Sequence, residues 1–207
     1  MKRKMVCLCE YEFEAEIPES VDLSKEPHLE QAILSGEFLT SRCPNCGKLL
    51  KPEFPVLIRD PAMESTLYFV PELDRGPFYR GALSYPIGEV TRVAIGYDEL
   101  VEKFLIKKAG LDDRVVEVLK YYLLQKALDS AAEEREVHIL FSSLEGDTLI
   151  FHAHGLKDGE VGVLRVSRQM AEKVGSQLEE KRHQEPFTQI LAGPYVSVNK
   201  LMTETPE

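Results

Sequence analysis

The sequence predicts an α+β protein in which a small metal-bound β unit with an αα-hairpin is followed by a small C-terminal α+β module. Three observations support this fold. All four cysteines lie in the first quarter of the chain, as two close pairs. Residues 98–128 space their apolar side chains as a helix does, with a glycine near the middle. Residues 137–166 alternate between apolar and polar side chains, and turn residues separate the runs.

The second cysteine pair, Cys43-Pro44-Asn45-Cys46-Gly47, has the spacing of a metal-binding knuckle. Proline fixes φ for the turn, and glycine can adopt the positive φ that folds the backbone under a metal ion. Backbone N–H groups would then point at the sulfurs and support the thiolate form that zinc requires. The redox motif of the same spacing opens a helix after a strand, whereas an apolar run with Pro52 and Pro55 follows here.

The first pair, Cys7 and Cys9, is one residue short of that spacing. On an extended strand, residues i and i+2 face the same side, so we expect both sulfurs to reach the same ion. Cys7, Cys9, Cys43 and Cys46 would then form a closed tetrahedral site in a zinc-ribbon-like unit, with structural zinc as the cofactor. Iron accepts the same four thiolates. The alternatives are that the first pair is ordinary buried apolar side chains, that the second is a redox pair, or that the four form disulfides.

Length, composition and charge limit the function classes. The 207 residues suffice for one or two domains, and no apolar run approaches the ~18 residues of a membrane span. The N-terminus lacks the apolar region of a signal peptide, so we expect a cytoplasmic protein with reduced thiols. Residues 1–132 hold 22 acidic and 17 basic side chains, and residues 133–207 hold 13 and 8. Neither part is basic overall, which disfavours nucleic acid as a partner.

Local patterns predict the elements between and after the cysteines. Residues 11–17 alternate strictly between apolar side chains and glutamates, as in a half-buried strand. A helix is expected from Pro27 to Leu34, with Gly36 as its C-terminal stop. The prolines in residues 51–59 predict an irregular strand or one at a sheet edge. Further short strands are expected over residues 67–70 and 90–95.

Two helices joined by a tight turn, an αα-hairpin, are predicted over residues 98–128. Gly110 followed by Leu111 matches a Schellman stop for the first helix. Asp112 is a suitable N-cap for the second helix.

The polar connector at residues 131–136 predicts a domain boundary. We therefore expect a metal-binding domain at residues 1–130 and a C-terminal module at residues 135–207. The module begins with three alternating strands. A helix capped by Ser167 and a last strand at residues 195–198 would complete a β-β-β-α-β arrangement.

Other candidate sites are weaker than the cysteines. His152 and His154 lie at i and i+2 of one predicted strand, and His138 lies on the facing strand, a set that can bind zinc or copper. No acidic ligand accompanies them at a fixed offset, so an exposed polar strand face is the better interpretation. No stretch matches a nucleophile elbow or a glycine-rich phosphate loop. The sequence leaves open whether the protein is an enzyme and favours a non-catalytic role.

Residues 6–125 resemble the CpXC family of bacterial and archaeal proteins, which is named for its Cys-Pro-x-Cys motif. The matching segments are Cys43-Pro44-Asn45-Cys46-Gly47, Leu34-Ser35-Gly36-Glu37-Phe38 and residues 55–61, 68–72 and 110–114. The resemblance implies a metal-binding domain with no established activity. Such proteins usually carry a second Cys-Pro-x-Cys near the N-terminus, where this chain has Cys7-Leu8-Cys9. Cys9 maps well onto the second cysteine of that motif, and Cys7 maps poorly. The chain from residue 133 onward lies outside the resemblance.

These observations together predict a cytoplasmic, zinc-stabilised, non-catalytic binding or adaptor protein, whose partner is another protein or a copy of itself. Two other functions remain open. One is an enzyme with its site between the two modules. The other is a nucleic-acid-associated zinc ribbon, which would require a basic patch around Arg42, Lys48 and Lys51.

Overall fold

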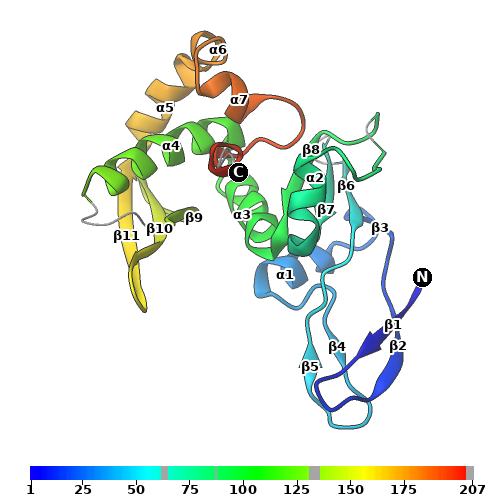
Figure 1. Cartoon of the computed structure of the whole chain (residues 1–207). Helices are drawn as coiled ribbons and strands as arrows, with labels where there is room; N and C mark the ends of the chain where they lie inside the picture. The colour runs from blue at the N-terminus through cyan, green and yellow to red at the C-terminus, as the bar shows by residue number, and fades with distance from the viewer. Residues whose placement is uncertain (62–64, 87, 131–135, 204–207) are drawn as a thin grey trace. The chain divides into compact units, whose positions relative to one another are not determined.

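The computed structural model describes residues 1–61, 65–86, 88–130 and 136–203 as a mixed α+β protein with several small sheets (Figure 1). The chain divides into two compact units, Met1–Val101 and Glu102–Glu207. The boundary predicted at residues 131–136 falls almost entirely on residues outside the described ones. The division into residues 1–130 and 135–207 therefore stays a prediction.

Unit 1 contains two small hairpins and a four-stranded sheet, with short helices between them. Its elements are β1 (Lys2–Val6), β2 (Glu12–Glu16), β3 (Ser20–Asp22), α1 (His28–Ser35), β4 (Ser41–Arg42), β5 (Leu49–Leu50), β6 (Val56–Asp60), β7 (Ser65–Val70), the 3-10 helix η2 (Glu72–Asp74), α2 (Arg75–Tyr79), β8 (Arg92–Ile95) and the start of α3 (Gly96–Lys108). Antiparallel pairing joins β1 to β2 and β4 to β5. In Figure 1 these two hairpins lie side by side.

The four-stranded sheet has the order β3-β6-β7-β8. β6 and β7 are antiparallel, and the outer strands β3 and β8 pair in parallel. Residues 51–59 were predicted to form an irregular strand or one at a sheet edge, and residues 51–55 have no regular structure. The edge position is wrong for the second half, because β6 lies inside the sheet and buries Val56, Leu57 and Ile58. Pro52 and Pro55 precede β6 in a segment without regular structure, so they do not interrupt its hydrogen bonds.

The helix and strand that separate the two cysteine pairs follow their predicted patterns. β2 exposes Glu12, Glu14 and Glu16 and buries Ala15. α1 ends at Gly36, whose φ of 79° is left-handed and whose N–H bonds to carbonyls of the last turn. Glycine suits this position because it has no Cβ to clash with the carbonyl oxygen.

The turn between α3 and α4 (Asp113–Ser130) also agrees with the prediction. Leu111 N–H donates to the Ile106 carbonyl at 3.1 Å, and Gly110 N–H donates to the Lys107 carbonyl at 2.9 Å. These are the two bonds of a Schellman motif. The Asp112 carboxylate accepts a 2.9 Å bond from Arg114 N–H, which satisfies one of the free N–H groups at the start of α4.

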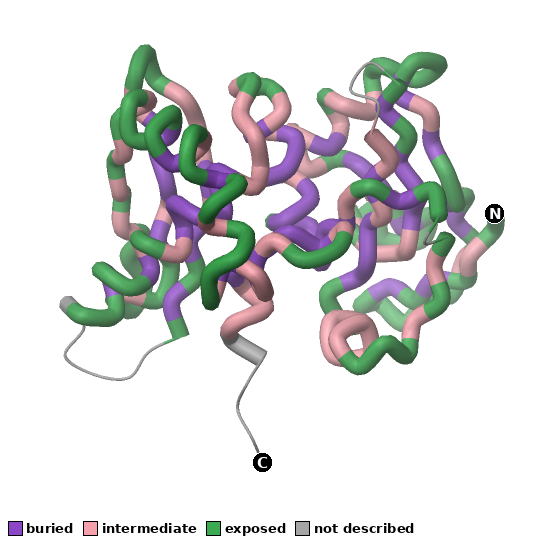
Figure 2. Tube along the Cα trace, turned by 90° about the horizontal axis from the view of Figure 1, so that it is seen from above, coloured by how far each residue is buried: buried purple, intermediate pink, exposed green. Residues whose placement is uncertain are grey.

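Unit 2 contains the rest of α3 and a three-stranded sheet with helices. Its further elements are α4, β9 (His138–Glu145), β10 (Thr148–Lys157), β11 (Glu160–Ser167), α5 (Arg168–Ser176), α6 (Leu178–Lys181), α7 (Phe187–Leu191) and the 3-10 helix η3 (Val198–Thr203). The antiparallel sheet has the order β11-β10-β9. Leu149, Phe151 and Ala153 of β10 belong to a core shared with Val116 and Leu119 of α4. The tube in Figure 2 shows buried stretches (purple) alternating with exposed turns (green).

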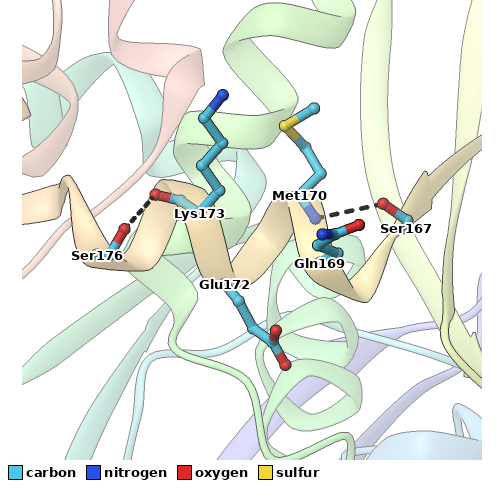
Figure 3. A pocket seen from close by; sticks show the side chains of 6 residues that line it. All are labelled: Ser167, Gln169, Met170, Glu172, Lys173 and Ser176. Carbon is cyan, nitrogen blue, oxygen red and sulfur yellow. Dashed lines mark hydrogen bonds between the residues drawn. The ribbon is translucent and has the colours of Figure 1, made fainter.

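The helix predicted after the third strand is α5. Figure 3 shows its N-cap, where the Ser167 hydroxyl accepts a 3.3 Å bond from Met170 N–H. At the other end the Ser176 hydroxyl donates to the Lys173 carbonyl at 2.8 Å. Met170 and Lys173 project from the same side of the helix, along an open hollow in its exposed face.

The last strand predicted at residues 195–198 is wrong. Residues 195–197 have no regular structure and η3 begins at Val198. Their backbone groups bond to charged side chains instead of a strand. The Lys103 ammonium donates to the Val196 carbonyl at 2.9 Å, and the Glu117 carboxylate accepts from Val198 N–H at 2.9 Å. The predicted strand is therefore a buried segment that pairs with none of the described strands.

Lys103 and Glu117 belong to a buried charge network within unit 2. Lys120 lies 2.8 Å from Glu102 and 3.2 Å from Glu117, and all three side chains are almost fully buried. Glu102 also accepts a 2.6 Å bond from Phe141 N–H in β9. Burial raises the pKa of Glu102 to about 7; Lys120 opposes this rise and Glu117 adds to it. The network therefore connects α3 and α4 to β9 and to the segment before η3.

Replacing Lys120 by methionine should destabilise the protein by about 3–5 kcal/mol, because it leaves the buried Glu102 carboxylate without its ammonium partner and leaves Glu117 to the more distant Lys103, at 3.6 Å. The penalty should be smaller at pH 5 than at pH 8. With a pKa above its ordinary 4.5, Glu102 binds a proton more tightly in the folded state, so falling pH through this range favours folding. Urea unfolding at both pH values measures the effect. The matched control is Lys126→Met on the exposed side of α4, expected within about 0.5 kcal/mol of wild type. Equal costs for the two variants would contradict the role of the network.

Candidate metal centre

The four cysteines lie in the turns of the two small hairpins of unit 1. Cys43 follows β4, and its turn is closed by bonds from Cys43 N–H to the Lys48 carbonyl and from Gly47 N–H to the Cys43 carbonyl, both 2.9 Å. Gly47 has a φ of 73°, the positive value expected for this knuckle. The prediction for the Cys43–Cys46 turn is confirmed.

The expectation that Cys7 and Cys9 lie on an extended strand is wrong. β1 ends at Val6, and Cys7, Leu8 and Cys9 form the turn into β2. Cys7 N–H donates to the Tyr11 carbonyl at 3.0 Å, and Glu10 N–H donates to the Cys7 carbonyl at 2.8 Å. Glu10 has a φ of 65°. The first turn therefore repeats the second with one residue fewer, and Glu10 occupies the position that Gly47 has in the second.

The two turns bring the four sulfur atoms within 4.8 Å of one another. Cys7 Sγ lies 3.6 Å from Cys46 Sγ, and Cys9 Sγ lies 3.8 Å from Cys43 Sγ. A disulfide requires about 2.05 Å, so neither pair is bonded. Four sulfurs at about 2.3 Å from a central zinc ion would be about 3.8 Å apart at the corners of a tetrahedron. The observed spacing therefore fits a four-thiolate metal site, although Cys7 was expected to map poorly.

Hydrogen bonds to the sulfurs differ between Cys7 and Cys9. The backbone N–H of Tyr11 and the Asn45 amide, 3.7 Å away, lower the pKa of Cys9 to about 6. The Cys9 N–H lowers the pKa of Cys7, but burial and the three neighbouring thiols outweigh it and raise that pKa to about 11. A cation among the sulfurs would hold all four as thiolates.

The contribution of Asn45 was not predicted. It stands between Cys43 and Cys46 in the sequence, yet its side chain reaches Cys9 on the other hairpin. A variable position inside a Cys-Pro-x-Cys spacing carries no signal for such a contact. Cys7 and Cys43 are buried and Cys9 and Cys46 are exposed, so the cluster lies at the surface with one side covered.

The other sequence candidates do not form a comparable cluster. A metal ion could be held by a group of three or more histidine, cysteine or carboxylate side chains. Within the described residues, the four cysteines are the one group whose atoms lie close enough together. His138 and His154 are opposite each other in the β9–β10 register, and His138 lies 3.2 Å from Glu136. Two of the three basic residues near the knuckle make internal contacts. Arg42 donates to the Gly47 carbonyl at 2.7 Å, and the Lys51 ammonium lies 3.5 Å from the centre of the Tyr97 ring.

Comparison with known protein families identifies the family to which the chain belongs. The model of the CpXC protein family matches residues 5–120, more than half of the chain. The chain belongs to the CpXC family. An uncharacterized protein of Treponema pallidum (strain Nichols) is 24% identical over 216 residues, covering 96% of this chain and 97% of the relative. No solved structure matches the chain.

The family match begins near the end of β1 and ends within α4, so it includes all four cysteines, the second cysteine hairpin and the four-stranded sheet. The three-stranded sheet of unit 2 lies outside the matched residues. It is nevertheless within the alignment to the Treponema pallidum protein, which extends over nearly the whole of both chains. The similarity between this CpXC protein and its relative therefore extends beyond the residues of the family match. Among the described residues, no helix has the length and apolar character to cross a membrane.

Glu10→Gly should raise the free energy of unfolding by about 0.5–1 kcal/mol, because glycine adopts a positive φ without the steric cost that glutamate has there. Thermal or urea unfolding of the purified protein measures the change. The control is Glu12→Gly, at an exposed position in β2, which should lower stability by about 0.5–1 kcal/mol. A loss of stability in both variants would show that Glu10 is not held at a positive φ.

Proposed function

We propose that Cys7, Cys9, Cys43 and Cys46 bind one structural zinc ion, and that this CpXC protein is a non-catalytic protein-binding or adaptor protein. Its N-terminal hairpins would then be a zinc-ribbon-like unit. Four thiolates fill a tetrahedral zinc ion and leave no position for a water or substrate, which argues for a structural role. The sulfur spacing near 3.8 Å is consistent with zinc. Free thiols persist in a reducing compartment, so the proposed location is the cytoplasm.

One observation carries the binding role: the cysteine hairpins expose apolar side chains to solvent. Leu8, between Cys7 and Cys9, is 80% exposed, and Val6 beside it is 65% exposed. Leu49, just after the second turn, is 54% exposed and Tyr11 is 44% exposed. Exposed apolar groups gathered on a rigid element are typical of surfaces that contact another protein. A zinc ion would fix the two hairpins and so hold these side chains in place. The partner would be another protein or a second copy of this chain.

Elemental analysis of untagged protein should find about one zinc per chain. Cys9→Ser and Cys43→Ser should lose the metal and unfold the N-terminal unit, because each removes a ligand from a site that contributes folding energy. Cys7→Ser should behave in the same way. Asn45→Ala is the control, since it removes only a 3.7 Å contact to Cys9 and should retain zinc. Metal retained in Cys7→Ser alone would indicate a three-cysteine site. No metal in wild type would refute the proposal, and iron would refute the assignment of zinc.

Leu8→Asp should abolish partner binding without loss of zinc, because its side chain is exposed and is not a ligand. We would compare partners enriched from the cell of origin, and self-association in sedimentation velocity, for wild type and Leu8→Asp. Leu73→Asp is the matched control, since Leu73 is 94% exposed in η2 of the same unit but lies outside the cysteine hairpins. Identical partners and identical sedimentation for all three proteins would reject a binding role for the hairpins.

A further inference from the structure

A pocket of about 250 Å³ in unit 2 lies among the first turn of α4, α6 and α7, which are labelled in Figure 1. Its apolar lining includes Leu178 and Leu191. The polar lining consists of two arginines, a glutamate and a threonine, namely Arg114, Arg182, Glu179 and Thr188. Binding pockets for drug-sized molecules commonly have volumes of about 300 Å³ or more, so this slightly smaller pocket suits a smaller ligand.

Thr188 lines this pocket and carries a buried polar atom without a hydrogen-bond partner. Among the described residues, its hydroxyl oxygen is the buried side-chain atom without a hydrogen-bond partner. The surrounding backbone is satisfied, because Thr188 N–H donates to the Gln184 carbonyl at 3.1 Å. The Lys200 ammonium donates to the carbonyls of Gln189 at 3.0 Å and Ala192 at 2.6 Å. Proteins rarely leave a buried hydroxyl unpaired, since its lost hydration is not compensated.

The two arginines are held in place by neighbouring carboxylates and retain unused donors. Arg114 uses Nε and Nη2 to bind Asp112, the N-cap of α4, with the shortest bond at 2.7 Å. Arg182 uses Nη1 to bind Glu179 at 3.1 Å. A guanidinium group has five N–H donors, so Nη1 of Arg114 and Nε and Nη2 of Arg182 are available to a further acceptor. Both guanidinium groups are partly exposed, which leaves these donors accessible to a molecule from solvent.

We propose that this pocket binds a small organic oxyanion, a carboxylate or phosphate carried on a short apolar group. The Thr188 side chain rotates so that its hydroxyl donates to an oxygen of the anion, and the free N–H groups of Arg114 and Arg182 supply positive charge and further bonds. The apolar part of the ligand contacts Leu178 and Leu191. The site is independent of the cysteine cluster, so it adds a ligand to the proposed function without depending on it.

The test is a titration of full-length protein with benzoate, phenyl phosphate and benzamide, followed by amide chemical shifts in NMR spectra. Benzamide has the shape of benzoate without the charge. Benzoate or phenyl phosphate should bind saturably with a dissociation constant of about 1 mM or below, and the shifts should centre on α6 and α7. Benzamide should bind at least about tenfold more weakly. The ratio of the two anions identifies carboxylate or phosphate as the preferred group. No saturation with either anion by about 20 mM would overturn the proposal.

Variants separate a built site from general attraction of anions. Thr188→Val removes the hydroxyl and keeps the shape, so it should weaken anion binding by about fivefold or more while leaving the melting temperature equal or higher. Thr188→Ser keeps a hydroxyl and should bind as wild type does. Arg182→Gln should weaken binding by a similar factor without unfolding the protein, since its ion pair with Glu179 is exposed. Unchanged binding in Thr188→Val and Arg182→Gln would overturn the proposal, because the anion would then be bound elsewhere.

Discussion

The two cysteine hairpins of unit 1 are joined where four sulfur atoms come together. β4 and β5 have two residues each and β1 and β2 have five, and two-stranded hairpins of this size are marginal in water. Their turns bury Cys7 and Cys43 and expose much of what surrounds them. A metal ion shared by the four cysteines would supply what such hairpins lack, a strong link between segments far apart in the sequence. The remainder of unit 1 is stabilised in another way, because the β3-β6-β7-β8 sheet buries apolar side chains of its own.

Unit 2 fixes its irregular parts with charges in addition to its apolar core. The segment before η3 and the outer strand β9 each bond through a backbone group to a buried carboxylate of α3 or α4. Lys120 sits between these carboxylates. Such a network adds little net stability compared with apolar packing, but it fixes which backbone atoms meet. Unit 1 thus gathers four cysteine sulfurs between its two small hairpins, and unit 2 uses buried ion pairs to position short segments.

Features with local causes could be predicted from the sequence, and features with distant causes could not. Gly36 and Gly110 end helices, and Asp112 and Ser167 begin them, because each acts within one turn of its own position. The turn at Cys7–Cys9 was missed because it needs a positive φ at Glu10, a residue without preference for it. The segment at residues 195–198 reads as a strand, but its backbone bonds to Lys103 and Glu117, about 80 residues or more away in sequence, and no local pattern signals these contacts. All four cysteines were named correctly as a cluster, whereas no motif signals the pocket around Thr188.

The bond between Glu102 and Phe141 N–H also affects which edge of the three-stranded sheet can accept a further strand. β9 is one edge of that sheet, and an edge strand can recruit a further strand only through free backbone groups. The Glu102 carboxylate occupies one of those groups on β9. Within the described residues, no strand lies beyond β11 at the other edge, where Val161 and Val163 are exposed. An added strand, whether from a partner or from an aggregating copy, would therefore meet less competition for backbone groups at β11 than at β9.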